Sequence, residues 1–577
     1  MRYAVLNEAL ALKGYRGLPH ALVDRKTGVA EPLNRRDFFL FNICDGTIDL
    51  DVIMLSEEQR KRLDELKQQN LITYLETAVP VDKARRYRRT DNYYIRSVHW
   101  SVTGRCNLNC RHCYMSAPDQ KYRDLTREEC FRVIRQFYEA NVQTVSITGG
   151  EPFVRTDLFQ ILDYINQMGM EVSQIYTNGT LLNKEKLRWF IQRKHTPQFV
   201  LSFDGIGSHD WIRGQKGAQE QAILAIRLLK AEGFSVMIET ALCRRNIDSL
   251  LDTYRLLREL GVDCWKTSMI FSAGEWKEQR EKELKQEDLY DAYLKLIREY
   301  TCEDAPMDLQ LDGFFACPRH HPKQWFSPYR RKEYEGKGEY SLSCGTCRVH
   351  PYLLPDGTLL PCATMTDSKA EPWMPNLLRE PLNEIYRNLS HPFFGIANMR
   401  VSEIVGSNKD CCVCAHRRVC GGGCRAMSYL EKKGLMGHSD ILCLFFNGGY
   451  ELQIEQTVNL AVQGTQSGKG GKKMGSKEAL KKVLEEQPEA MEKLNKITEL
   501  PKEERKKALL DFAEEYRIEL KEEDFTQESG ELTEQELGKV AGGNDIVDAI
   551  GVFTGIWGVF PPSTGRGTTN GTKRFKK

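Results

Sequence analysis

The sequence lacks an excess of charge of either sign. Its 82 lysines and arginines are balanced by 80 aspartates and glutamates, so the formal net charge is +2. A nearly neutral chain shows no sign of a surface built for nucleic acid. We therefore expect no nucleic-acid partner.

Long apolar runs are also missing. Met1–Glu8 contains no uninterrupted apolar stretch of the kind that a secretory signal peptide needs. The apolar segment at 546–560 is short, broken by glycines and interrupted by Asp548, so it does not predict a membrane span. We expect a cytoplasmic protein that has no membrane partner.

Cysteine, in contrast, is abundant. Eighteen cysteines without a secretion signal favour metal binding, because disulfides are rare in the cytosol. Cys106, Cys110 and Cys113 follow the spacing C-x3-C-x2-C. Three thiolates at this spacing can hold three irons of a 4Fe-4S cluster and leave the fourth iron open, whereas a structural zinc site needs a fourth protein ligand.

A second motif, Thr148-Gly149-Gly150-Glu151-Pro152, follows after the length of a helix. The glycine pair allows a close backbone approach, and Glu151 supplies a carboxylate for a ligand's ammonium group. Together the two motifs resemble the radical S-adenosylmethionine (SAM) enzymes, whose open iron chelates the methionine part of SAM. A zinc knuckle followed by a chance glycine pair is the alternative.

The resemblance implies a chemistry and a setting. An external one-electron reductant supplies the cluster, SAM is cleaved, and a 5′-deoxyadenosyl radical takes hydrogen from the substrate. Cys106, Cys110 and Cys113 are then the catalytic and cluster-binding cysteines. Since clusters with an open iron are generally sensitive to oxygen, we expect an anaerobic or low-oxygen cytoplasm.

Residues 96–310 alternate short apolar runs with amphipathic helices, such as Arg127–Ala140 and Lys184–Arg193. The expected strands are Val98–Thr103, Thr144–Thr148, Glu171–Thr177, Phe199–Phe203, Val236–Ala241 and Cys264–Ser268. Repeated strand–helix units predict an α/β fold with a parallel sheet or barrel and function at the carboxyl ends of the strands. The resemblance implies a partial (β/α)6 barrel like that of TIM.

The resemblance also implies contacts with SAM at the ends of these strands. The glycine motif meets the methionine end, His112 packs near the adenine, and the Thr177 and Ser202 segments contact the ribose and carboxylate. Arg213 reaches the SAM carboxylate or, alternatively, faces solvent. The full set is His112, Thr148, Gly149, Gly150, Glu151, Thr177, Asn178, Ser202, Asp204 and Arg213.

Residues 340–450 carry a second group of cysteines. Their order resembles the SPASM domain of radical SAM peptide maturases and implies two auxiliary 4Fe-4S clusters, three clusters in all. One would be held by Cys344, Cys347, Cys362 and Cys424, and the other by Cys411, Cys414, Cys420 and Cys443. Cys317 or a substrate atom could replace Cys344, and zinc is the alternative to the clusters.

Residues 1–82 predict a small α/β module. Strands at Tyr3–Lys13 and Ala21–Leu33 precede helices Asp37–Cys44 and Ser56–Gln69 and a strand at 71–75. This order is that of a winged helix and resembles the leader-recognition element of peptide-modifying enzymes. A nucleic-acid winged helix is less favoured, because the segment has no concentrated basic helix.

The carboxyl-terminal part resembles a precursor peptide. Residues 463–476 predict a flexible linker. Residues 477–543 predict charged helices ending at a double glycine, as in the nitrogen-fixation-like leaders of ribosomally synthesised, post-translationally modified peptides (RiPPs). A charged, dimerising helix pair is the alternative. Residues 544–577 are then the core peptide.

The core contains no cysteine, which excludes a thioether within it. Phe553, Trp557 and Phe560 favour a carbon crosslink at an aromatic residue over inversion of an α-carbon. The sequence thus predicts a radical SAM peptide maturase whose precursor peptide is fused in cis. Its rivals are a peptide epimerase, a sulfatase-type maturase, and a non-catalytic iron–sulfur electron-transfer or zinc scaffold protein.

Overall fold

The computed structural model describes residues 1–25, 28–119, 121–270, 274–278, 284–327, 340–430 and 433–469, with isolated positions 493, 496, 497, 508 and 512. Met1–Val462 form one unit. The expected leader helices, except for those isolated positions, and the whole expected core lie outside the described residues.

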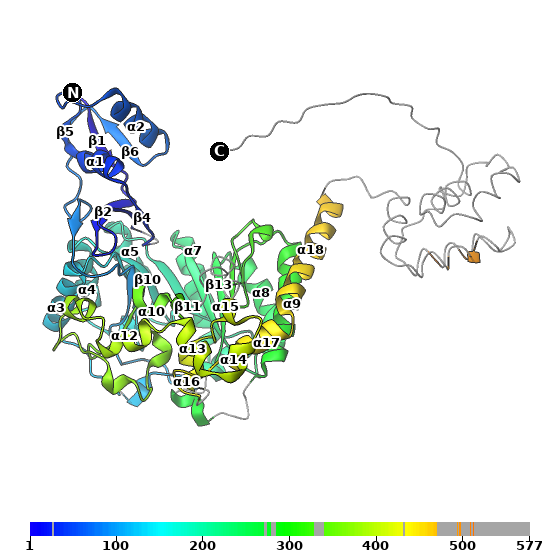
Figure 1. Ribbon diagram of the computed structural model, residues 1–577. Coiled ribbons are helices and arrows are strands. Elements are labelled where there is room, and N and C mark those ends of the chain that lie inside the picture. The colour runs from blue at the N-terminus through cyan, green and yellow to red at the C-terminus, as the bar shows by residue number, and fades with distance from the viewer. Residues whose placement is uncertain are drawn as a thin grey trace, which may run out of the picture. The chain divides into compact units, whose positions relative to one another are not determined.

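A large, mostly parallel sheet forms the centre of this unit (Figure 1). Its middle strands are β8 (Ser97–Ser101), β9 (Thr144–Thr148), β10 (Glu171–Thr177), β11 (Gln198–Ser202), β12 (Val236–Leu242) and β13 (Cys264–Met269). They are parallel neighbours in chain order. These are the six strands that the sequence predicts, so the α/β fold with a parallel sheet is confirmed.

The sheet extends beyond the predicted strands at both ends. On one side, β14 (Asp308–Leu311) pairs parallel with β13, and β15 (Phe315–Cys317) pairs antiparallel with β14. On the other side, β16 (Tyr352–Leu353) pairs parallel with β8, and β17 (Leu359–Leu360) pairs antiparallel with β16. The cysteine-rich region therefore contributes strands to the barrel's own sheet.

Amphipathic helices follow the strands and cover the sheet (Figure 1). They are α3 (Arg127–Glu139), α4 (Leu158–Gln167), α5 (Lys184–Gln192), α6 (His209–Arg213), α7 (Ala218–Ala231), α8 (Leu250–Glu259) and α9 (Gln286–Cys302). Helix α3 begins at a capping box of Thr126 and Glu129 and buries Val133, Ile134 and Phe137. Caps and periodicity of this kind explain why its bounds match the prediction.

The region from 340 onward consists, besides β16 and β17, of short helices and one long final helix. They are α10 (Thr346–Val349), α11 (Leu382–Arg387), α12 (Pro392–Ala397), α13 (Val401–Ser407), α14 (Lys409–Val413), α15 (Arg417–Cys420), α16 (Arg425–Leu430), α17 (Asp440–Asn447) and α18 (Tyr450–Lys469). Across the described ranges, no helix has both the length and the apolarity to span a bilayer.

The amino-terminal module contains two small sheets. The first sheet has the strand order β5-β1-β6 and consists of β5 (Asp45–Asp49), β1 (Tyr3–Leu6) and β6 (Ile72–Leu75). The second sheet has the strand order β4-β3-β2-β7 and consists of β4 (Ala30–Pro32), β3 (Ala21–Asp24), β2 (Leu10–Gly14) and β7 (Arg88–Arg89). Helices α1 (Arg35–Ile43) and α2 (Glu57–Gln68) pack on the first sheet.

The expected single strand Tyr3–Lys13 is wrong, because Asn7 accepts hydrogen bonds from the backbone of Ala9 and Leu10 and turns the chain.

The predicted linker is partly wrong as well, because α18 continues through Lys469 into the expected tract 463–476. Ile454, Val458 and Ala461 are buried at helical spacing just before this tract. Extending an existing helix costs less than nucleating one. The helix therefore continues into residues that composition alone assigns to a linker.

Candidate active site

The carboxyl ends of the parallel strands open into a cavity of about 600 Å³. All expected contacts except Glu151 and Asp204 line it. These are Cys106, Cys110, His112, Cys113, Thr148, Gly149, Gly150, Thr177, Asn178, Ser202 and Arg213. The three cysteines lie on the loop after β8, while Thr148, Thr177 and Ser202 end β9, β10 and β11. The strand ends thus bring residues from distant parts of the sequence together.

Each thiol of this trio accepts a hydrogen bond. The Leu108 backbone N–H donates to Cys106 Sγ at 3.4 Å, and the Ala117 N–H donates to Cys113 Sγ at the same distance. An Arg213 guanidinium nitrogen lies 3.8 Å from Cys110 Sγ. Such donors suit thiolates that bind iron, since hydrogen bonds to the sulfurs tune an iron–sulfur cluster.

The glycine pair lets its strand end pass directly against the cysteine loop. A Cβ on Gly149 would lie 2.7 Å from the carbonyl oxygen of Thr103, and one on Gly150 would lie 2.2 Å from that of Arg105. The Gly150 and Glu151 N–H groups donate to these same carbonyls. The glycines therefore position the loop that carries the cysteines.

We expect Gly150→Ala to lose most of its cluster iron, because the added methyl group must displace the backbone of the cysteine loop. Iron content after anaerobic reconstitution and the absorbance of the cluster measure this loss. Gly395→Ala is the matched control, since a Cβ there meets nothing within 4 Å. Equal iron in the two variants would contradict this role for Gly150.

Glu151 is fully buried and its carboxylate is held by the protein. It accepts hydrogen bonds from Thr177 Oγ1 at 2.9 Å and from the backbone N–H groups of Asn178 at 2.7 Å and Phe153 at 3.1 Å. Burial raises the pKa of Glu151 to about 7. Glu151 thereby joins the ends of β9 and β10 behind the cavity wall.

Asp204 is also fully buried, and it positions Arg213. Its carboxylate accepts two hydrogen bonds from the Arg213 guanidinium, at 2.6 and 3.1 Å, and one from the Ala241 N–H at 3.0 Å. His209 lies 3.4 Å from the same carboxylate. Arg213 thus faces the cavity and Cys110, not bulk solvent.

His112 lines the cavity, and its ring nitrogen Nδ1 is buried. Among the described residues, its Nδ1 has no hydrogen-bond partner, and burial lowers the pKa of the ring to about 4, so the imidazole is neutral. A buried polar atom of this kind calls for a partner that the protein itself does not supply. This nitrogen and the three hydrogen-bonded thiols fit a cluster with SAM beside it.

The structure brings the first expected auxiliary set together. The Cys347 thiol shares hydrogen bonds with the thiols of Cys344 and Cys362. Burial raises the pKa of Cys424 to about 11, and the nearby Cys362 and Cys344 add to the shift. Cys317, the alternative to Cys344, lies on β15 with its sulfur against the carbonyls of Pro318 and His321.

The second expected set is grouped too. Burial raises the pKa of Cys420 to about 12, and the thiols of Cys443, Cys411 and Cys414 contribute further. The neighbouring Cys412 instead directs its sulfur to the Val405 carbonyl at 3.0 Å. Within the described ranges, no three His, Cys, Asp or Glu side chains converge on one common metal ion. A 4Fe-4S cluster makes a different demand, because each thiolate binds its own iron.

Further polar residues that the sequence reasoning missed line the cavity, and five of them are charged or aromatic residues on or beside the sheet strands. They are His99, Tyr176, Glu239, Lys266 and Asp312. Asp312 has a backbone φ of 29°, an uncommon conformation for a residue other than glycine. Glu239 and Lys266 stand inside predicted buried strands, where a charged residue is itself a signal.

Sequence comparisons agree with this site. The radical SAM superfamily matches residues 100–257. An AdoMet-dependent heme synthase of Methanosarcina barkeri is 27% identical over 347 residues, which cover 58% of this chain and 92% of that protein. A PqqA peptide cyclase of Gluconobacter oxydans is 26% identical over 370 residues, or 63% and 93% of the two chains. The subtilosin biosynthesis protein AlbA of Bacillus subtilis is 30% identical over 177 residues, or 30% of this chain and 39% of AlbA.

The fold is also shared with known structures. Streptococcus suis SuiB bound to S-adenosylmethionine aligns with a TM-score of 0.52 and 16% identity over 76% of this chain and 99% of SuiB. The match to residues 100–257 spans β8 to α8, which carry the cysteine loop, the glycine pair and Arg213. Residues 100–257 of this chain are therefore a radical SAM domain, and the chain is an enzyme; such a domain implies SAM and a 4Fe-4S cluster.

Proposed function

We propose that this enzyme modifies a ribosomally synthesised precursor peptide, its own fused tail, by forming an intrapeptide carbon crosslink at an aromatic core residue. The observation that carries the proposal is the cavity itself. Its lining contains the thiol trio and a second group of polar residues, so the cavity can hold the cofactor and a substrate side by side. The PqqA peptide cyclase and AlbA, whose names describe a peptide cyclase and a bacteriocin biosynthesis protein, support a peptide substrate.

In this proposal Cys106, Cys110 and Cys113 hold the cluster, and the residues of the glycine motif hold the methionine end of SAM. When bound, the cluster and SAM together supply a carbon radical that removes a hydrogen atom from the substrate. The protein orients these groups. Arg213 sets a positive charge beside Cys110, and Asn178 lies 3.9 Å from Cys106 Sγ.

Two auxiliary clusters, each held by four further cysteines, would supply electron transfer to the reaction. The first would be bound by Cys344, Cys347, Cys362 and Cys424, and the second by Cys411, Cys414, Cys420 and Cys443. The loop that follows Cys362 supports a role near the substrate, because Ala363, Thr364 and Thr366 line the same cavity. Forming a crosslink removes two hydrogens, so one electron and one proton must leave the substrate in addition to the abstracted hydrogen atom. An auxiliary cluster would accept the electron.

The remaining parts serve substrate delivery. The module at 1–82 would bind the leader within 477–543, and the fusion would raise the local concentration of the core at 544–577. An external one-electron reductant would act on the cluster. The Methanosarcina barkeri heme synthase matches 58% of the chain, against 63% for the peptide cyclase, so a tetrapyrrole substrate is the second candidate.

Mass spectrometry of the tail tests the proposal. With the reconstituted enzyme, SAM and reductant, we expect residues 544–577 to lose the mass of two hydrogens, with fragments that place the link at Phe553, Trp557 or Phe560. Omitting SAM is the control. A tail whose mass is unchanged in ordinary water, but which takes up deuterium when the reaction is run in heavy water, would instead indicate epimerisation. If the tail stays unaltered and the enzyme modifies an added porphyrin, a tetrapyrrole is the substrate and the peptide function is refuted.

A further inference from the structure

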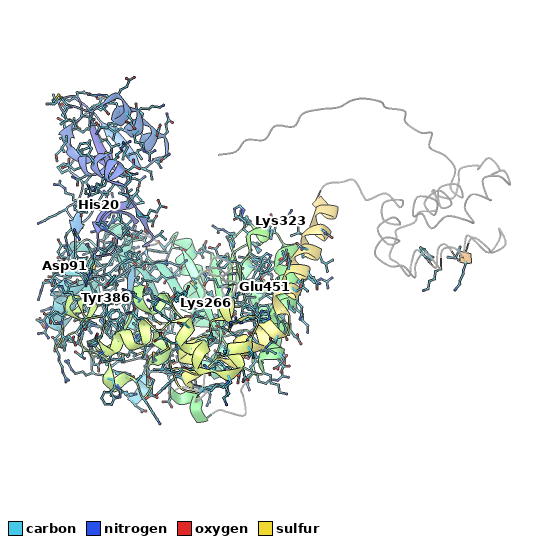
Figure 2. All side chains as sticks on the ribbon, in the orientation of Figure 1. His20, Asp91, Lys266, Lys323, Tyr386 and Glu451 are labelled. Atoms are coloured by element: carbon cyan, nitrogen blue, oxygen red, sulfur yellow. The ribbon has the colours of Figure 1, made fainter. Side chains whose placement is uncertain are left out.

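One wall of the cavity carries an ion pair that the cofactor site does not use. Glu239 on β12 and Lys266 on β13 are direct partners in the register of these parallel strands. Lys266 Nζ lies 2.5 Å from a carboxylate oxygen of Glu239, and both residues line the cavity. Figure 2 labels Lys266 in the region of the sheet strands of Figure 1.

A floor of buried apolar residues lies beneath the pair. Two residues earlier on the same strands, Met237 and Cys264 point to the same side and pack with Val200, beside Tyr176. All three floor residues are buried. The side chains of Lys266 and Glu239, in contrast, are 36% and 31% exposed. Both residues line the cavity, so the exposed surface of their side chains faces it.

Stability of the fold does not account for the pair. Moving two charges out of water costs free energy, and well-packed apolar residues usually stabilise such a site as well or better. Met237 and Cys264 show that apolar residues fit these strands. The Glu239 carboxylate raises the pKa of Lys266 above its usual value, which outweighs burial and keeps the ammonium charged.

Two uncharged rings and the carboxyl group of Asp312, whose pKa burial raises, lie beside the pair. Burial lowers the pKa of His99 to about 3 and raises that of Tyr176 to about 12, so both rings are neutral. Their centroids lie 4.8 Å apart. Tyr114, which follows Cys113, is close enough to Glu239 for that carboxylate to raise its pKa further, after burial and Tyr352. The pair therefore lies near the cysteine loop.

We propose that Glu239 and Lys266 bind an amide group of the substrate peptide and hold it beside the cofactor residues. Lys266 Nζ donates a hydrogen bond to the amide carbonyl oxygen, and the Glu239 carboxylate accepts one from the amide N–H. No bond is made or broken in this step. The inference rests on the proposed peptide substrate and deepens it by naming the group that is recognised.

The charges of the pair favour an amide over an ionic ligand. Each charge is already compensated by its partner, so a cationic or anionic side chain would have to compete with an existing ion pair. A neutral dipole can instead bind the remaining donor and acceptor positions of both groups. An amide offers its acceptor and donor side by side, as this pair requires.

The test compares substrate modification with cofactor cleavage in the full chain. In Lys266→Met we expect the yield of modified tail to fall roughly tenfold or more, while 5′-deoxyadenosine formation and iron content stay near wild type. Lys230→Met is the matched control. Its ion pair with Asp263 has a similar distance, 2.6 Å, and similar side-chain exposure, 29% and 25%, but lies outside the cavity wall.

A second comparison identifies the ligand chemistry. Glu239→Gln keeps an acceptor oxygen and is expected to retain more modification of the tail than Glu239→Leu. If the bound group were a cation, both variants would lose modification to the same extent. Equal modification by Lys266→Met and wild type would overturn this inference alone. So would a parallel loss of 5′-deoxyadenosine and product, because the pair would then act on the cofactor. Wild-type enzyme that cleaves SAM but leaves its tail unaltered would overturn the peptide function as well.

Discussion

Cys110→Ala is expected to abolish SAM cleavage and all modification of the tail. Cys110 belongs to the thiol trio that lines the cavity, and its sulfur lies next to the Arg213 guanidinium. Two thiolates cannot hold the same three irons, so the SAM-binding cluster should be lost and total iron should fall by about one third. Formation of 5′-deoxyadenosine and the iron content of the reconstituted protein measure the two effects.

Cys302→Ala provides the control for this loss. Cys302 is exposed at the end of α9 and outside all three groups of expected ligands. Its replacement removes one thiol without leaving a cavity in the core. A Cys110→Ala enzyme that still altered its peptide would refute the radical mechanism proposed for this chain.

The second large effect is expected from Cys344→Ala. Cys344 is hydrogen-bonded with Cys347 and lies near Cys424. If it is the fourth ligand of the first auxiliary cluster, its loss should remove the route by which the substrate gives up its last electron. We therefore expect modified tail to fall to near zero, while SAM cleavage continues at a rate close to that of the wild type.

Cys317→Ala distinguishes this assignment from its alternative. Cys317 is buried on β15 and directs its sulfur to backbone carbonyls. Its variant should keep three clusters and full product yield. If Cys317→Ala loses a cluster and Cys344→Ala does not, the ligand set at this cluster has to be reassigned. Iron content and electron paramagnetic resonance of the reduced proteins separate the two results.

The barrel strands could be predicted because each is a short apolar run bounded by a turn or a helix cap. Phe199 and Leu201 are buried on β11, and the capping box of Thr126 and Glu129 marks the start of α3. Such signals are local. The pairing of β16 with β8 could not be predicted, because its partners are His99 and Tyr352, which are far apart in the sequence.

The candidate site likewise has residues that the sequence predicts and residues that it does not. Cysteine spacing and the glycine pair are local patterns, and their residues line one cavity. The hydrogen bond that Arg213 donates to Asp204 depends on how α6 packs. The sequence could therefore not distinguish a residue that contacts SAM from a residue that supports such a contact. Glu239 and Lys266 were overlooked because strand assignment treats a polar position in an apolar run as noise.

The pairing of β8 with β16 also has a consequence for biosynthesis. On the ribosome, β8 is complete long before Tyr352 and Leu353 are made. Until then one edge of the growing sheet exposes unpaired backbone amides and carbonyls, the feature by which nascent chains recruit wrong partners. We therefore expect this edge of β8 to be open to wrong pairing until β16 has been synthesised.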